Sequence, residues 1–220
     1  MAEVITLSEH YRQAHERLSA FVRACADRDT EPVPATPGWT VHDVVAHLTG
    51  VAQDVAGGWS PTGGPTEEWT AGHVARGRDV PTLSLLETWA AACPAVEELL
   101  DRQPIWPVVL DVGSHEHDVR AALGDRDARD VPLVTVGADW LLRKLRAPRP
   151  LVVRTELGEI RVGPDDGAPV TLDTTAFEAF RWRLGRRSRR QLAAMAWSDD
   201  PEPFLDHLCV FGPARDDVVE

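Results

Sequence analysis

The segment LDVGSHEHDVRAALG, residues 110–124, concentrates side chains that can bind a metal ion or transfer a proton. Asp111 and His115 are four residues apart, so both project from the same face of a helix. A carboxylate and an imidazole in this arrangement can bind one cation together. Glu116 and His117 project from other faces, and the two histidines are too close together for the H-E-x-x-H pattern of zinc proteases.

His47, in the segment VHDVVAHLTG, is the candidate for a third ligand. Val44 and Leu48 share its helical face, so we expect the imidazole to lie among buried side chains. Catalytic zinc sites use three protein ligands and an open position, and the cores of helical bundles can hold them. The alternative is that His47 is a hydrogen-bonded core residue. In that case Asp111 and His115 are a pair of solvent-exposed side chains on their helix. By spacing alone, that alternative is the more common one.

Apolar residues at helical spacing predict the elements that would position these side chains. Thr40 is a good N-cap, and Asp43 three residues later completes a short form of the capping box. Gly57 and Gly58 end that helix. The predicted helices cover residues 5–26, 40–56, 82–102, 110–124 and 133–146. The glycine-rich segment 57–75 is long and polar, which is typical of a mobile lid.

The pattern changes near residue 148, where prolines precede short β-branched runs separated by Gly and Asp turns. These runs predict strands, and helical patterns follow them. The predicted strands are 151–155, 159–163 and 170–173, and the later helical patterns are 176–185, 188–197 and 201–212. We therefore expect an α+β protein with an all-helical domain, residues 1–147, and a small α+β domain, residues 148–220.

Composition argues against several classes of function. The chain has 220 residues and a net charge of −12, with 35 acidic against 23 basic residues, which argues against nucleic-acid binding by the surface as a whole. It has no apolar run of the roughly 18 residues that a membrane span needs. Cys25, Cys93 and Cys209 are scattered singly and no secretion signal is recognisable, so we expect a cytoplasmic protein with reduced thiols.

Three segments resemble the mycothiol-dependent maleylpyruvate isomerase family, which lies within the wider group of DinB-like bundles. TPGWTVHDVVAHLTG is similar to the family's opening motif, in which a helix ends in a metal-binding histidine. DVGSHEHDVRAALG resembles the second motif, an acid followed after three residues by a histidine. The segment 180–213, FRWRLGRRSRRQLAAMAWSDDPEPFLDHLCVFGP, resembles the second domain of actinobacterial members.

The resemblance implies a DinB-like four-helix bundle followed by a small α/β domain. It also implies that His47, Asp111 and His115 bind a divalent metal, with zinc expected, and that mycothiol is the thiol cofactor. The family usually has Glu where Asp111 stands. Because Asp is one methylene shorter, either its helix comes closer to the metal or the site holds the metal less tightly.

The resemblance further implies a small electrophilic substrate. A thiol bound to such a metal is deprotonated near neutral pH and becomes a nucleophile. It can add to an activated alkene and allow cis–trans isomerisation, or it can displace a leaving group or open an epoxide in an S-transfer. We expect a thiol-dependent isomerase or transferase, either a monomer or a homodimer, without nucleic-acid or membrane partners. The alternative is a metal-stabilised binding or regulatory protein of the same family, without catalysis.

Other polar and aromatic residues near the motifs have two possible roles each. Asp118 either orients a metal ligand or carries a charge used in helix packing. Arg120 either meets an acidic substrate or joins a surface ion pair. We expect His42 to be exposed in the first turn of its helix, and Trp39 to act as a hydrophobic staple before it.

An arginine run makes one part of this acidic chain strongly basic. Its members are Arg181, Arg183, Arg186, Arg187, Arg189 and Arg190. Arg186, Arg187 and Arg190 are candidates for binding the carboxylate of a substrate or of the thiol cofactor. The more common role of such a run is a solvated face whose charges pair with nearby Asp and Glu. A nucleic-acid module, the weakest alternative function, rests on this run alone.

Overall fold

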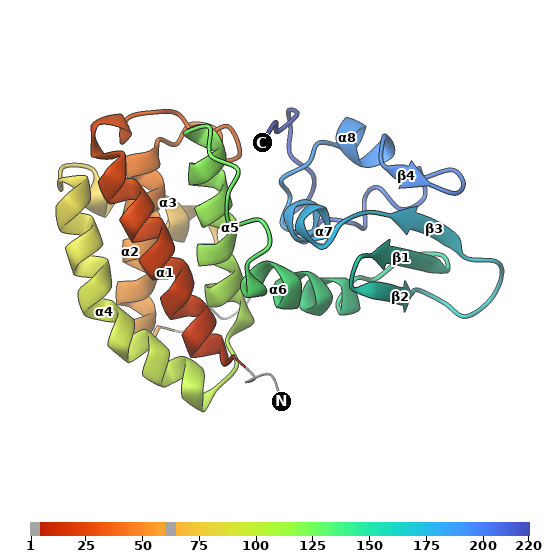
Figure 1. Cartoon of the computed structure of the whole chain (residues 1–220), viewed down its shortest axis with the longest axis horizontal. Coiled ribbons are helices and arrows are strands. Elements are labelled where there is room, and N and C mark those ends of the chain that lie inside the picture. Colours follow the sequence, from red (N-terminus) through yellow and green to blue (C-terminus); the bar gives the residue numbers. More distant parts are fainter. Residues whose placement is uncertain (1–4, 60–64) are drawn as a thin grey trace. The chain divides into compact units, whose positions relative to one another are not determined.

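Four long helices enclose the core of the N-terminal part of the chain (Figure 1). They are α1 (Leu7–Ala24), α2 (Val41–Ala56), α4 (Thr82–Arg102) and α5 (Trp106–Ala122). In the computed structural model, which describes residues 5–59 and 65–220, α1 and α2 each pack against both α4 and α5. Every helix of the bundle therefore has two neighbours, and the expected four-helix bundle is confirmed.

Local sequence signals explain where these helices begin. The side chain of Thr40 accepts a hydrogen bond from the backbone N–H of Asp43, and the Asp43 carboxylate accepts one from the Thr40 N–H. This capping box satisfies two backbone donors at the start of α2. Thr6 caps α1 through the N–H of Glu9. Pro107 stands in the first turn of α5, where its missing N–H costs no hydrogen bond.

Helix α5 is buried on nearly all sides. Every residue from 108 to 120 is buried except Asp111, which is half-buried. Glu116 and His117 do project from other faces than Asp111, but those faces meet the core rather than water. The alternative of a solvent-exposed helix is therefore wrong, and the polar groups of α5 must find partners inside the protein.

The segment between the second and third predicted helices forms a helix of its own. The expected lid covers residues 57–75, of which 60–64 lie outside the described residues, and from Glu67 the chain forms α3 (Glu67–Gly77). This helix packs against α2. A side chain at Gly77 would collide with Ala46 of α2, so the glycine allows the two helices to approach closely. The short η1 (Ala26–Arg28) follows α1.

The C-terminal part of the chain combines helices with one small mixed sheet. Its helices are α6 (Pro132–Arg143), α7 (Ala176–Arg183) and α8 (Arg189–Ala193), and its strands are β1 (Leu151–Thr155), β2 (Gly158–Val162), β3 (Val170–Asp173) and β4 (Ala196–Trp197). The strand order is β2-β1-β3-β4, with β1 and β3 parallel and the outer pairs antiparallel. Leu151, Val153, Val170 and Leu172 alternate inward and are buried. The α+β class is confirmed.

The chain divides into the compact units Met1–Arg126 and Asp127–Glu220, so the division comes before the boundary expected near residue 148. Helix α6 belongs with the C-terminal unit because it packs against α7. Its apolar face, including Leu141 and Leu142, is buried. The change from helical to strand patterns near residue 148 shows where the type of secondary structure changes. It does not indicate whether α6 packs in the core of the N-terminal or the C-terminal unit.

Two expected helices near the C-terminus differ from the structure. The pattern over 188–197 gives only α8, after which the chain pairs as β4 with β3. Residues 201–212 form turns instead of a helix. Phe204, Leu205 and Leu208 are nevertheless buried, so their apolar spacing reflects packing in a turn and not helical periodicity.

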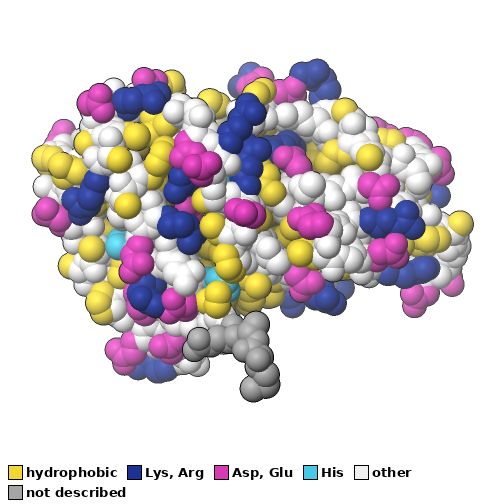
Figure 2. Space-filling view, viewed as in Figure 1, with side chains coloured by type: hydrophobic (Ala, Val, Ile, Leu, Met, Phe, Trp, Pro, Cys, Tyr) yellow, Lys and Arg dark blue, Asp and Glu magenta, His cyan; other side chains and the backbone are white. Residues whose placement is uncertain are grey.

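The surface carries both signs of charge. On the face shown in Figure 2, acidic and basic side chains are interspersed, in keeping with a chain whose excess of acidic residues is spread out. Among the described residues, no helix combines the length and the apolar character required to cross a bilayer.

Candidate metal centre

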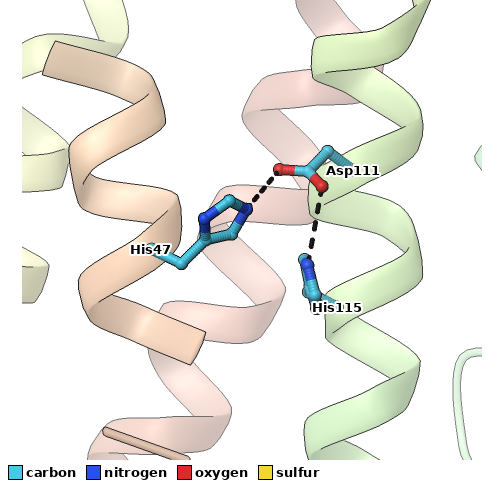
Figure 3. A group of neighbouring side chains, drawn as sticks. All are labelled: His47, Asp111 and His115. Atoms are coloured by element: carbon cyan, nitrogen blue, oxygen red, sulfur yellow. Dashed lines mark ion pairs between the residues drawn. The ribbon is translucent and has the colours of Figure 1, made fainter. Parts of the chain in front are cut away.

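Three side chains from two neighbouring helices converge on one point (Figure 3). His47 comes from α2, and Asp111 and His115 come from α5. The Oδ2 atom of Asp111 lies 3.3 Å from Nε2 of His47, and its Oδ1 atom lies 3.5 Å from Nε2 of His115. One potential ligand atom from each residue lies within 4.8 Å of the other two. The structure thus brings together the three residues that the sequence selected.

The three side chains differ in their exposure to solvent. His47 and His115 are buried, whereas about a third of the Asp111 side chain, 31%, remains accessible. The carboxylate therefore marks the side of the cluster that faces solvent. Because α2 and α5 are adjacent in the bundle, the short aspartate side chain reaches His47 across the helix interface, while it faces His115 one turn along its own helix.

The outer nitrogen of His115 faces a second carboxylate. Asp118, on the next turn of α5, is fully buried and places Oδ2 2.9 Å from Nδ1 of His115, although the N–H direction departs from a good hydrogen bond. A buried negative charge at this distance favours a proton on Nδ1, which leaves Nε2 with its lone pair for a cation. Of the two roles expected for Asp118, the geometry favours orientation of His115.

The outer nitrogen of His47 faces another histidine. Nδ1 of His47 lies 3.2 Å from Nδ1 of His73, a buried residue of α3. Nε2 of His73 in turn lies 2.9 Å from Oδ2 of Asp54. Asp54 also accepts a hydrogen bond of 2.7 Å from the Trp69 indole and one of 3.1 Å from Arg76. Polar residues of α2 and α3 thus continue the cluster away from Asp111.

Burial and hydrogen bonds shift the pKa values in this part of the cluster. Burial lowers the pKa of His73, and the neighbouring Asp54 opposes this effect only in part. Burial tends to raise the pKa of Asp54, but hydrogen bonds from His73 and Trp69, together with the charge of Arg76, outweigh it, so the pKa is lowered. At neutral pH these shifts correspond to a neutral imidazole beside an ionised carboxylate.

Comparison with known proteins shows the family to which this chain belongs. Residues 11–131 match the family model described as the mycothiol maleylpyruvate isomerase N-terminal domain. The match covers more than half of the chain and includes His47, Asp111 and His115. The chain belongs to the mycothiol maleylpyruvate isomerase N-terminal domain family.

Two solved structures share the fold of this member of the mycothiol maleylpyruvate isomerase family. A crystal structure of the mycothiol-dependent maleylpyruvate isomerase carrying a histidine-to-alanine substitution is 15% identical, with a TM-score of 0.58 over 81% of this chain and 88% of that chain. A crystal structure of the mycothiol-dependent maleylpyruvate isomerase is 16% identical, with a TM-score of 0.53 over 82% of this chain and 88% of that chain. No curated protein matches the sequence.

Tryptophans surround the candidate site in this family member. The Trp39 ring lies with its centroid 5.2 Å from that of His47 and stacks at 6.1 Å on His115. The Trp69 ring stacks on Trp59 at 4.3 Å and meets His73 edge-on at 4.2 Å. The Trp39 ring therefore lies against both candidate ligands, and its role as a hydrophobic staple stays a prediction.

Two polar residues of the motifs have structural partners. Arg120 pairs with Glu116 and Asp125 and lies over the Phe21 ring, so its ion pairs are largely buried and not at the surface as expected. The expectation that His42 is exposed is wrong. The imidazole is half-buried, with Nδ1 2.8 Å from the Thr82 hydroxyl and Nε2 3.2 Å from the Gly77 carbonyl oxygen.

The arginine run is engaged within the C-terminal unit. Arg187 donates to Glu178 at 2.7 and 2.8 Å and to Glu220 at 3.1 Å. Arg190 pairs with Asp217 although most of its side chain is exposed. Arg186 donates to the carbonyl of Leu184. Binding of a substrate or cofactor carboxylate by Arg186, Arg187 and Arg190 stays a prediction, and these partners would compete with it.

Sequence reasoning missed Asp54, Trp69 and His73. The signals were nevertheless present. Thr66 followed by Glu67 and Glu68 is typical of a helix start, and the Thr66 side chain does accept from the backbone N–H of Trp69. A helix predicted over residues 67–77 would have indicated that one face of this segment turns its side chains toward the core.

Proposed function

We propose that this protein is a metal-dependent enzyme that uses mycothiol either to isomerise a small electrophilic substrate or to form a thioether with it by S-transfer. The observation that carries the proposal is the convergence of His47, Asp111 and His115 at the interface between α2 and α5. Membership in the mycothiol maleylpyruvate isomerase family supports the choice of thiol and reaction class.

The donor set suits a divalent metal such as zinc. Two imidazoles and one carboxylate are common zinc ligands, and three protein ligands leave a further position for a substrate or thiol. Asp111 contributes the only negative charge among the three, so a bound divalent ion would keep a net positive charge. Both imidazoles turn Nε2 toward Asp111 while Nδ1 faces another polar group, an orientation that suits two imidazole ligands.

The metal would supply Lewis acidity that lowers the pKa of a thiol near it. Cys93 and Cys209 of the chain itself are poor sources of that thiol. Burial raises the pKa of Cys93 to about 12 and that of Cys209 to about 11, so both stay protonated at neutral pH. An external low-molecular-weight thiol fits the site better, because it can approach the half-buried side at Asp111.

The aromatic surroundings favour a flat, unsaturated substrate. Trp39 covers His47 and His115 on one side, and Trp69 lies near His47 with a centroid distance of 6.3 Å. Indole rings offer large apolar faces that pack against conjugated carbon skeletons and exclude water. Both properties suit addition of a thiol to a conjugated alkene, which water would otherwise compete with.

Turnover with mycothiol tests the proposal. The purified, metal-loaded protein is mixed with mycothiol and maleylpyruvate, and separately with an electrophile that bears a leaving group. Proton NMR follows the alkene geometry, and mass spectrometry detects a thioether product. We expect one of the two products, with loss of turnover when the metal is removed. Metal binding without either product would overturn the enzymatic proposal and favour a binding protein.

Arg190 allows a separate test of the arginine prediction. The side chain is 82% exposed, so Arg190→Ala is expected to leave the fold intact. If Arg190 binds a carboxylate of the thiol or substrate, the variant raises KM at unchanged metal content. An unchanged KM would contradict carboxylate binding by Arg190, whose role would then be the ion pair with Asp217.

A further inference from the structure

The His73 ring packs against α2 at Gly50, where there is no side chain. A Cβ atom placed on Gly50 would lie only 2.5 Å from Cδ2 of His73 and 2.6 Å from its Cγ. Any side chain at position 50 would therefore displace the ring. Glycine in the interior of a helix is less favourable than alanine. Its presence here is explained by the close approach of the imidazole.

The same face of α2 carries the two partners of His73. His47, Gly50 and Asp54 are separated by three and four residues, so they follow one another along one helical stripe. His73 lies above the glycine, with Nδ1 3.2 Å from Nδ1 of His47 and Nε2 2.9 Å from Oδ2 of Asp54. One imidazole of α3 thus connects a candidate metal ligand to a carboxylate on the same helix.

The positions of the protons follow from this geometry. The ionised Asp54 carboxylate can only accept, so the hydrogen of a neutral His73 is on Nε2 and its Nδ1 is an acceptor. Nδ1 of His47 lies within hydrogen-bond distance of that acceptor and therefore donates to it. Nε2 of His47 is then the nitrogen that can offer its lone pair to a metal. Trp69 and Arg76 supply further donors to that carboxylate and keep it ionised as an acceptor.

We propose that His73 and Asp54 are positioning residues that hold His47 in the tautomer and ring orientation needed for metal binding. His115 has a carboxylate, Asp118, beside its outer nitrogen, whereas His47 reaches its carboxylate through a second imidazole. The relay also makes the geometry of His47 depend on the docking of α3. This inference rests on the metal site of the proposed function and adds residues that act on it.

Zinc affinity of His73 variants tests the inference. Affinity is measured by competition with a chromophoric chelator for the native protein, for His73→Phe and for His73→Asn. Phe keeps a ring but removes the acceptor, and we expect zinc binding to weaken about 10- to 100-fold, the usual effect of losing the partner of a histidine ligand. The Asn amide oxygen can replace Nδ1 as acceptor, so His73→Asn should recover part of the loss. Equal affinity of His73→Phe and the native protein would overturn the inference.

Further variants separate positioning from simple structural support. Asp54→Asn keeps the side-chain shape and weakens the acceptor, so it should lower zinc affinity while denaturant unfolding of the metal-free protein changes little. Gly50→Ala should lower affinity by displacing the His73 ring, without removing a polar group. His207→Asn, at an exposed residue of the C-terminal unit, is the control and should leave affinity unchanged. If affinity falls only in proportion to the loss of folding stability, the positioning role is refuted.

Proton positions give a test that does not depend on bound metal. Nitrogen-15 NMR of the metal-free protein should show a hydrogen on Nδ1 of His47 and on Nε2 of His73, with Nδ1 of His73 unprotonated. The opposite tautomer of His73 would contradict the relay. If the native protein binds no zinc while these tautomers are found, the proposed function fails and the hydrogen-bond relay remains only a structural contact, which overturns its positioning role as well.

Discussion

Oδ2 of Asp111 lies 3.3 Å from Nε2 of His47, across the interface between α5 and α2. The same carboxylate lies 3.5 Å from Nε2 of His115 through its other oxygen. One short side chain therefore faces both imidazoles. The two consequences expected from aspartate at this position, a closer approach of its helix or a weaker metal site, stay predictions.

Substitution of Asp111 should separate the effect of charge from that of side-chain length. Asp111→Asn removes the negative charge. It should weaken zinc binding at least as much as loss of the hydrogen-bond partner of a histidine ligand does, which is about 10- to 100-fold. Asp111→Glu restores the residue usual in the family and should retain binding. Isothermal titration with zinc measures both. Unchanged affinity in Asp111→Asn would show that the carboxylate is not a ligand.

His115→Ala should abolish metal binding and thiol-dependent turnover while the helical fold, followed by circular dichroism, is kept. His117→Ala provides the comparison on the same helix. Because His117 is buried, its loss should destabilise the protein by roughly 1–3 kcal/mol, yet metal content should stay at the native level. Loss of metal from His117→Ala but not from His115→Ala would mean that the opposite face of α5 holds the ion.

Glu116 should matter for stability and not for metal. Its carboxylate is fully buried and accepts hydrogen bonds of 2.9 and 2.7 Å from Arg17 and one of 3.3 Å from Arg120. Glu116→Ala would leave both guanidinium groups without this partner, which should destabilise the protein by about 3 kcal/mol, the low end for buried pairs because Arg17 is partly exposed. Urea unfolding measures the loss. A stability within about 0.5 kcal/mol of native would contradict the structural role.

Cys93 should be unreactive in the folded protein. Burial raises the pKa of its thiol to about 12, and the thiolate is the reactive form. Iodoacetamide at pH 7.5, read by peptide mass spectrometry, should label Cys93 only after unfolding. Cys93→Ala should also retain mycothiol-dependent turnover. Rapid labelling of the native protein, or loss of turnover in the variant, would indicate that the chain supplies its own thiolate.

Much of the N-terminal bundle was predictable because its helices carry strong local signals. The predicted range 82–102 coincides with α4, and the capping box at Thr40 and Asp43 is formed. The three candidate ligands were selected by helical spacing together with family resemblance. The distance between α2 and α5 was not contained in either pattern, since it depends on how the helices pack.

Other parts of the site depended on tertiary contacts that no local pattern encodes. Helix α3 is short and follows a glycine-rich segment, so its sequence predicts a loop and does not indicate that His73 faces the core. Gly50 was the available clue, because a glycine in the interior of α2 is unfavourable unless another group must come close. The change of pattern near residue 148 likewise indicated where strands begin, whereas α6 joined the later unit through its contacts with α7.

Anomalous diffraction at the zinc absorption edge tests the metal centre most directly. Crystals of the protein grown with zinc should show one strong anomalous peak between His47, Asp111 and His115, with ligand distances of about 2.0–2.2 Å to nitrogen and oxygen. The peak should disappear in crystals of His115→Ala. A zinc-soaked crystal with no peak among these three residues would contradict the account.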